Sequence, residues 1–313
     1  EDGHGNQIAN EPLTAKDHAG ALAALIDWLD RRGEIESLRA IGHRLVHGGP
    51  HFTAPARIDD QMIAALHAIV PFAPNHLPQA LAAIAATRAA FPDLPQVACF
   101  DTAFHRTMPK VAQRFPLPPE FERDGVVRYG FHGLSYASIV DRLGDRLRPR
   151  TVIAHLGNGA SMVALRDGAS IDTTMGFTPL AGLMMGTRSG DLDPGLMLYL
   201  LQQTGRSIDE VADLVTNQAG LRGVSQRSAD MRTLLDHEDD DPQTAIALDL
   251  YVYLARKQLG ALIAVLGGLD LLVFTGGIGE HAYQIRERIG RDFAYAGIDI
   301  DPEKNNPSSH SSS

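Results

Sequence analysis

The segment that most constrains the fold is residues 151–174, where two glycine-containing turns separate three short apolar runs. The turns are Gly157-Asn158-Gly159 and Asp167-Gly168. Asn-Gly and Asp-Gly between apolar runs are a strong local signal for a β-hairpin, because these residues accept the backbone conformations of tight turns. The segment is therefore predicted to form an antiparallel meander of three strands.

Helical and strand patterns alternate before the meander, at residues 19–32, 38–46, 60–70, 78–91 and 96–100. After it, residues 194–268 are mostly helical, and 270–274 are predicted to be a buried strand that leads through a glycine-rich turn into a helix ending near 296. Alternation of this kind predicts an α/β protein with mixed sheets in two lobes. The proline-rich residues 106–125 are predicted to connect the lobes, and 305–313 to form a Ser-rich tail.

Composition narrows the function classes. A chain of 313 residues has room for about two domains. The formal net charge of −10 and the absence of a basic face argue against nucleic acid as a partner. No apolar run reaches the roughly 18 residues that a membrane span requires, and no signal peptide is expected. Cys99 is the one cysteine, which favours a reducing cytoplasm.

Two glycine-rich turns are candidate phosphate sites. Backbone N–H groups of 157–161 can cradle phosphate oxygens, although an ordinary hairpin turn explains the same pattern. Residues 275–279, Thr-Gly-Gly-Ile-Gly, follow a strand and precede a helix, where free N–H groups and the helix dipole attract anions. A tight β–α turn is the equal alternative there.

Charged side chains next to glycines are the candidate catalytic groups. Arg188 lies in a loop between Gly186 and Gly190, where it either binds a phosphoryl group or forms a solvated pair with a nearby Asp. Arg44 in an apolar strand is an anion ligand, a buried paired charge or a residue turned to solvent. Asp101 at a strand end is a Mg²⁺-associated carboxylate or an N-cap. His132 between glycines is presented to a ligand or held structurally.

These groups together favour phosphoryl transfer. Such chemistry needs positioning and charge neutralisation and little covalent work from the protein. The sequence shows no general base paired with a nucleophilic Ser or Cys, which agrees with that reading.

The chain resembles the acetate kinase family. The segments that carry the resemblance run in family order at 42–49, 100–105, 128–133, 155–161, 172–180, 185–194, 223–225 with Asp230, and 274–280. The resemblance implies the two-lobed, actin-like (ribonuclease H-like) fold with an interdomain cleft. It implies an N-terminal lobe at 1–105 that lacks the family's first strands, a nucleotide-binding lobe at 106–301 and the Ser-rich tail at 302–313.

By the same resemblance, the chain phosphorylates acetate reversibly from ATP by direct in-line transfer, with Mg²⁺ or Mn²⁺. The implied catalytic residues are Arg44, Asp101, His132 and Arg188. Those that bind substrate are Arg44, Val46, Phe131 and Pro179. Those that bind the nucleotide are His155, Asn158, Gly159, Asp230, Met231, Arg232, Gly277, Ile278 and Gly279. A cytoplasmic homodimer that pairs through the second lobe is also implied, with acetate, acetyl phosphate, ATP and ADP as its small-molecule partners and no membrane association.

The chain departs from the family pattern at several points. The family's first strand, with its Asn and a Ser-rich phosphate turn, and a metal-associated Glu near the C-terminus have no counterpart among the printed residues. Asp101 is then the possible metal ligand, and a nucleotide-binding module without turnover is an alternative. Residues 73–78 and 132–136 also differ from the family's motifs, the second ending in Tyr136 where the family has His. These two changes leave propionate or butyrate kinase as a further alternative.

Overall fold

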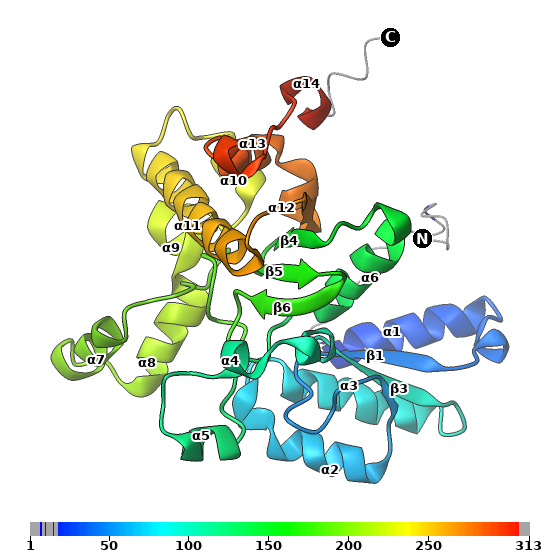
Figure 1. Ribbon diagram of the computed structural model, residues 1–313. Coiled ribbons are helices and arrows are strands. Elements are labelled where there is room, and N and C mark those ends of the chain that lie inside the picture. Colours follow the sequence, from blue (N-terminus) through cyan, green and yellow to red (C-terminus); the bar gives the residue numbers. More distant parts are fainter. Residues whose placement is uncertain (1–6, 8–9, 11–14, 16–17, 307–313) are drawn as a thin grey trace. The chain divides into compact units, whose positions relative to one another are not determined.

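The computed structural model describes residues 7, 10, 15 and 18–306 (Figure 1). Two compact units make up the chain. The first comprises the described residues up to Gly48 together with Ala54–Phe100, and the second comprises Gly49–Thr53 together with the described residues from Asp101 onward. The boundary follows Phe100, whereas the sequence predicted it after residue 105.

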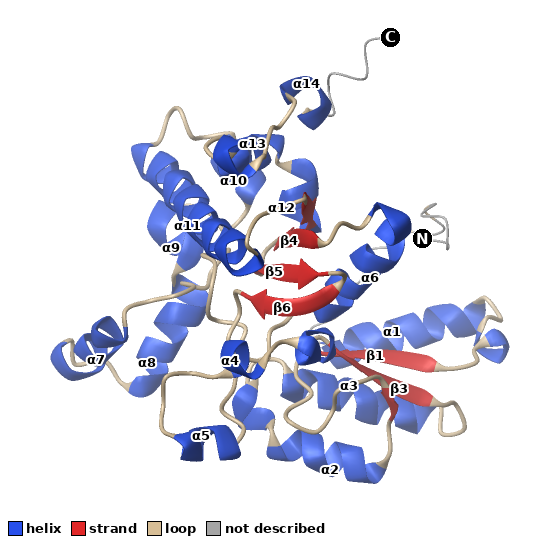
Figure 2. Cartoon of the chain, viewed as in Figure 1, coloured by secondary structure: helices blue, strands red, loops and turns tan. Residues whose placement is uncertain are grey.

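The first unit is a three-stranded mixed sheet packed against helices (Figure 2). The strand order is β1-β3-β2, with β1 parallel and β2 antiparallel to β3. Leu66, Leu77 and Ile84 contribute fully buried side chains to its core. Its elements are α1 (His18–Arg31), η1 (Ile35–Ser37), β1 (Ile41–Leu45), β2 (Ala56–Arg57), α2 (Asp60–Ala68), η2 (Val70–Phe72), α3 (Leu77–Ala90) and β3 (Gln96–Phe100).

The second unit contains a four-stranded mixed sheet of order β6-β5-β4-β7. The strands are β4 (Arg150–Leu156), β5 (Ala160–Arg166), β6 (Ala169–Thr173) and β7 (Leu271–Thr275). The first three pair antiparallel, and β7 runs parallel to β4. The predicted meander is confirmed, and Asp167 and Gly168 both take positive φ, of 51° and 83°, at the second turn.

Helices cover both faces of this sheet, so most of β4 and β5 is buried. Residue alternation along β4 and β5 directs Ile153, Val163 and Leu165 to the face where α6 (Gly133–Leu143) packs through Tyr136. The 25-residue helix α11 (Pro242–Leu266) also contacts β4, β5 and β6 (Figure 1). The N-terminus of α6 therefore lies near the end of β4.

Shorter helices complete the second unit. They are η3 (Ala103–Thr107), α4 (Lys110–Gln113), α5 (Pro119–Arg123), η4 (Gly144–Arg146), α7 (Pro194–Gln203), α8 (Ile208–Asp213), the π-helical η5 (Leu214–Gln218), α9 (Gly220–Ser225), α10 (Met231–Leu235), α12 (Gly276–His281), α13 (Tyr283–Gly290), η6 (Ala294–Ala296) and α14 (Pro302–Asn305). None of the helices in the described part of the chain is both long and apolar enough to cross a membrane.

Several local predictions need correction. Residues 106–125 belong to the second unit and fold into short helices, because Pro109 and Pro118–Pro119 start helical turns. The strand predicted as buried, now β7, is half-buried from Leu271 to Phe274 because it lies at the edge of the described sheet. The final predicted helix is interrupted at Ala282, between α12 and α13.

The predicted tail is partly structured. Asp301 caps α14 by accepting hydrogen bonds from two backbone N–H groups, and the Arg286 guanidinium binds the side chain and carbonyl of Asn305. Residues 302–305 therefore form a short helix, while 307–313 lie outside the described residues.

Candidate active site

His132 occupies a strained position at the start of α6. Its backbone is left-handed, with φ 59° and ψ 18°, a conformation that few residues other than glycine adopt. The next residue, Gly133, donates its N–H to the Asp101 carbonyl at 3.0 Å, and no side chain would fit there. Strain of this kind is concentrated at functional sites, where the surrounding fold enforces it. His132 is therefore held structurally, and its presentation to a ligand stays a prediction.

Side chains from β4 and β5 hold the His132 ring, and a side chain of α6 in turn holds the one from β4. His155 and Ser161 are directly opposite each other in the β4–β5 pairing, so they point to the face that α6 covers. The two imidazoles stack with centroids 4.3 Å apart, and Ser161 Oγ lies 2.8 Å from Nδ1 of His132. Ser135 Oγ is bonded to Nδ1 of His155 at 2.9 Å. The ring plane of His132 is thus fixed from two sides.

The hairpin loop 157–159 is in contact with Arg188. A Cβ built on Gly159 would lie 2.7 Å from Nη2 of Arg188 and 3.4 Å from Nε2 of His132. Both nitrogens therefore approach the same backbone position, which only glycine allows so closely. The tight-turn interpretation of this loop is confirmed, because the turn joins β4 to β5. The ligand-site interpretation stays a prediction, and the same turn meets two candidate catalytic groups.

Arg188 is a half-buried cation without a carboxylate partner among the residues that the structure describes. Its Nη1 donates to the Pro179 carbonyl at 2.6 Å, and burial lowers the pKa of its guanidinium, which nevertheless stays charged. The nearby Asp191 instead accepts from the Gly182 N–H at 2.7 Å and from Gln258. The alternative of a solvated Arg–Asp pair is therefore wrong, and an incoming anion would supply the missing counter-charge.

A cavity of about 910 Å³ lies within the second unit, beside the hairpin loop. Its size and mixed polar and apolar lining suit a nucleotide-sized ligand. Six of the residues predicted to bind nucleotide line it, on three separate segments of the chain: Asn158, Asp230, Met231, Arg232, Gly277 and Ile278. Gly157, from the turn that the sequence marks as a candidate phosphate site, also lines the cavity. The sequence did not single out the other residues of the lining, which are Ala229, Leu235, Asp236, His281, Ala282, Tyr283 and Gln284.

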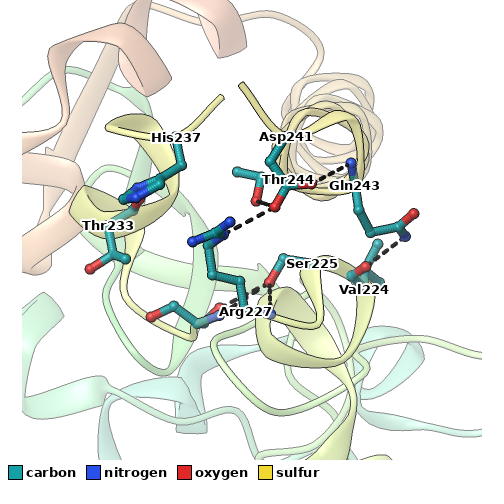
Figure 3. Close-up of polar contacts among 9 residues, drawn as sticks. Val224, Ser225, Arg227, Thr233, His237, Asp241, Gln243 and Thr244 are labelled. Atoms are coloured by element: carbon teal, nitrogen blue, oxygen red, sulfur yellow. Dashed lines mark hydrogen bonds and ion pairs between the residues drawn. The ribbon is translucent and has the colours of Figure 1, made fainter. Parts of the chain in front are cut away.

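Hydrogen bonds that involve the side chains of Ser225 and Arg227 stabilise the segment that contains Asp230 (Figure 3). Ser225 Oγ accepts from the N–H groups of Arg227 and Ser228, at 3.2 and 3.3 Å. The Arg227 guanidinium donates to Asp241 at 3.0 Å, and Asp241 also caps α11. Bonds from Thr244 and Arg227 lower the pKa of Asp241 to about 2.

Asp230 itself is the N-cap of α10. Its Oδ1 accepts from the backbone N–H and the hydroxyl of Thr233, both at 2.8 Å, and these bonds lower the pKa of its carboxyl. The carboxylate therefore orders the start of a helix whose first two residues, Met231 and Arg232, line the cavity.

The glycine-rich segment after β7 is helical, whereas the sequence predicts a turn there. Gly277, Ile278 and Gly279 already lie inside α12, and Gly276 alone takes a positive φ, of 78°. Gly279 is buried against Phe274 and the Ala154 carbonyl, so it allows the helix to approach the sheet and does not line the cavity. A helix that begins directly after a strand can have the same glycine pattern as a turn. The pattern therefore could not distinguish a helix start from a turn.

Asp101 and Phe131 are almost completely buried behind His132. The Asp101 carboxylate acts electrostatically on Tyr136 and is not an N-cap, since Thr102 occupies that position of η3. The Phe131 carbonyl accepts from Nε2 of His105 at 3.0 Å, and Ser170 Oγ lies 3.0 Å from Nδ1. Burial lowers the pKa of His105 to about 4, so it is neutral at pH 7.

Two predicted site residues belong to the first unit. Arg44 is exposed on β1, and Val46, which follows the strand, is half-buried. The preceding His43 is bonded to Gln96 on β3 at 2.8 Å. Exposure agrees with either a solvent-facing or a ligand-facing side chain, so the substrate-binding role of Arg44 and Val46 stays a prediction.

Comparison with known proteins gives consistent matches. The sequence profile of the Acetokinase family matches residues 2–313. The acetate kinase of Rhodopseudomonas palustris (strain ATCC BAA-98 / CGA009) is 50% identical over 293 residues, which cover 92% of this chain and 73% of that protein. The acetate kinase of Methylocella silvestris is 46% identical over 312 residues, covering 97% and 77%.

Solved structures agree. The crystal structure of Porphyromonas gingivalis acetate kinase superposes with a TM-score of 0.84 at 38% identity and covers 93% of this chain and 76% of that one. A propionate kinase from Francisella tularensis gives a TM-score of 0.88 at 36% identity, covering 92% and 76%. The α/β architecture with two mixed sheets flanked by helices is thus the architecture of these kinases.

Proposed function

Because this chain belongs to the acetokinase family, whose enzymes transfer phosphate to a carboxylate, we propose that it phosphorylates acetate reversibly from ATP, giving acetyl phosphate and ADP. The observation that carries the proposal is the meeting of Arg188 and His132 at Gly159, beside a cavity that Asn158 also lines. A guanidinium without a carboxylate partner among the described residues, next to an imidazole and beside a nucleotide-sized cavity, suits the terminal phosphoryl group.

The proposed reaction needs no general base. A carboxylate is ionised at neutral pH, so acetate attacks the phosphorus atom of the γ-phosphoryl group directly, and the bond to the ADP oxygen breaks. Arg188 then stabilises the charge on the equatorial oxygens of the group in transit, and His132 donates a hydrogen bond to it. His105, although buried nearby, is neutral and takes no proton in this scheme.

Nucleotide binding is assigned to the cavity of the second unit. Asn158 and Gly159 would contact the phosphates, while the Asp230–Arg232 segment and the first turn of α12 would enclose the nucleoside. His155 would act through the stacked His132 ring. Gly279 would keep α12 close to the sheet.

The Mg²⁺ that the family resemblance implies would reach the site with the nucleotide. Mg²⁺ uses one or two carboxylates and keeps phosphate oxygens and waters as its other ligands, so a single buried carboxylate fits its donor preference. Asp101 is that carboxylate, and among the described residues no group of three or more Asp, Glu, His or Cys side chains forms a metal site. When bound, the ion would neutralise phosphate charge.

The substrate pocket is proposed on the family resemblance. Arg44 would bind the acetate carboxylate or the phosphoryl group, and Val46, Phe131 and Pro179 would contact the methyl group. Pro179 receives support from its carbonyl contact with Arg188. Substitution of Arg44 by alanine is expected to lower turnover by about 10³-fold, as removal of a phosphoryl-binding arginine does elsewhere.

A homodimer in the cytoplasm is part of the same proposal. Helix α7 buries none of its residues, and Leu198 and Tyr199 are 56% and 57% exposed. An apolar helix face of this kind suits a second copy of the chain. Light scattering should give twice the monomer mass, and Leu198→Glu should give the monomer.

Acyl-phosphate trapping with hydroxylamine tests the activity. The protein would be incubated with ATP and Mg²⁺ and with acetate, propionate or butyrate in turn. The proposal expects hydroxamate that depends on ATP and Mg²⁺ and is formed fastest from acetate. Faster reaction with propionate would reassign the substrate, and ADP binding by calorimetry without product from any acid would indicate a nucleotide-binding module without turnover.

A further inference from the structure

The hydroxyl group of Tyr136 is deeply buried and makes a single hydrogen bond in the described structure. It lies on α6 with no exposed surface, and its Oη is 2.5 Å from Ser161 Oγ. Burial, together with the nearby Asp101 carboxylate, raises the pKa of the phenol, so Tyr136 keeps its proton. A buried O–H that donates to nothing is unfavourable, and Ser161 is the acceptor in reach.

Ser161 Oγ lies between Tyr136 and His132. It accepts a hydrogen bond from the Tyr136 hydroxyl, and its own single hydrogen is then free to point to the other neighbour, Nδ1 of His132 at 2.8 Å. A hydroxyl that donates to Nδ1 requires a lone pair on that nitrogen. The ring proton of the neutral imidazole must therefore be on Nε2.

The reverse arrangement is disfavoured. If Nδ1 carried the proton, it would donate to Ser161 Oγ. Ser161 would then either donate to Tyr136, so that the buried phenol would lose its acceptor, or accept from both neighbours, so that its own buried hydrogen would have no acceptor among the described residues. The direction of the chain is therefore set at its buried end, by a residue that does not face the reacting atoms.

We propose that Tyr136 and Ser161 are positioning residues that fix the proton of His132 on Nε2, where it faces Gly159 and Arg188. Nε2 lies 3.4 Å from the point where a Cβ of Gly159 would be, and Arg188 Nη2 lies 2.7 Å from the same point. An N–H there attracts a phosphoryl oxygen, whereas a lone pair there would repel it. The catalytic consequence rests on the proposed kinase activity, and the tautomer itself does not.

The tautomer is measured by ¹⁵N NMR of the protein labelled at histidine, at a pH where imidazole is neutral, with His132→Gln to assign the signal. The wild-type protein should show His132 protonated at Nε2. Tyr136→Phe, which keeps the ring, and Ser161→Ala should each increase the share protonated at Nδ1. Protonation at Nδ1 in the wild type, or an unchanged ratio in both variants, would overturn the proposal.

Kinetics separate positioning from packing. Both variants should lower kcat by about 10- to 100-fold with KM for ATP nearly unchanged, as loss of an outer partner of a functional histidine does. The double variant should be no slower than the slower single variant, because both act through one proton. Additive losses would contradict a shared route.

Tyr251→Phe is the matched control. Tyr251, on α11, is also buried, and its hydroxyl has no hydrogen-bond partner within the described structure. Its loss should leave both the tautomer and kcat at wild-type values. A kcat loss in Tyr251→Phe as large as that in Tyr136→Phe would show that removal of a buried phenol is enough, and would count against the proposal.

Discussion

The guanidinium of Arg188 lies against the backbone of Gly159, so close that a single added carbon atom would be 2.7 Å from its Nη2. The two residues belong to separate segments, a strand-connecting loop and a glycine-rich loop 29 positions later in the sequence. Their contact brings the cation that would stabilise the phosphoryl group beside the cavity that we propose binds the nucleotide. Four predictions follow from this contact and from its surroundings.

Gly159→Ala should damage catalysis without damaging the fold. The φ angle of Gly159 is not positive, so alanine is compatible with the backbone, and the added methyl group acts by displacing Arg188. We expect kcat to fall by about 10²-fold, since misplacement of a catalytic group by about 1 Å has that effect. Gly260→Ala on α11, whose methyl would only touch the Phe293 ring, is the control and should leave kcat unchanged.

Arg188→Ala should lower kcat by about 10³-fold or more, because it removes the half-buried guanidinium that lacks a carboxylate partner in the described part of the chain. Arg188→Lys keeps the charge but loses the planar fork that also reaches Pro179, so it should recover only part of the loss. Hydroxamate assays of both variants provide the measurement. Arg291→Ala, at an exposed pair with Glu287, should stay near wild type, and wild-type turnover in Arg188→Ala would refute the role.

Substitutions of Asp230 can distinguish its role as the N-cap of α10 from a role of its negative charge in binding the ligand. Asparagine retains an oxygen that caps α10, whereas alanine does not. If Asp230 acts by ordering the segment that lines the cavity, Asp230→Asn should bind ADP as the wild type does, and Asp230→Ala several-fold more weakly, in isothermal titration calorimetry. Equal weakening in both variants would show instead that the carboxylate charge contacts the ligand.

His105 should make the second unit sensitive to acid. Its pKa is about 4 in the folded protein and 6.5 in the unfolded chain, so the unfolded chain binds the extra proton between these values. The free energy of unfolding should therefore be highest above pH 6.5 and fall as the pH drops toward 4, by about 3 kcal/mol from this residue. Urea unfolding at a series of pH values measures the slope.

His105→Gln should flatten that slope, although it lowers stability at pH 7 by disturbing the bonds to Phe131 and Ser170. His67→Gln, at an exposed position of α2, is the control and should leave the slope as it is in the wild type. An unchanged slope in His105→Gln would mean that another group causes the acid sensitivity.

Local sequence patterns predicted the elements well where the pattern and the structure share one physical cause. The turns at 157–159 and 167–168 allowed the meander to be predicted. In the second turn, Asp167 and Gly168 adopt the positive φ that a tight hairpin requires. The limits of α3 and β3 came within one residue of the prediction, because Pro78 marks the start of the helix and Pro95 the start of the strand. The edge position of β7 was missed, because an apolar run does not reveal how many strands will flank it.

The sequence by itself determined which chemical groups the chain offers: a guanidinium between glycines, an imidazole directly before a glycine, and two glycine-rich loops, in an order that resembles one family. Tertiary structure alone decided what these groups do for one another. Ser161 can form a hydrogen bond with His132 because strand pairing directs both Ser161 and His155 toward α6. Arg188 contacts Gly159 because the loop after β6 brings it back to the hairpin. Contacts of this kind join residues that are far apart in the chain. A local sequence pattern describes one helix or strand at a time, so it does not predict contacts that depend on how several elements pack together.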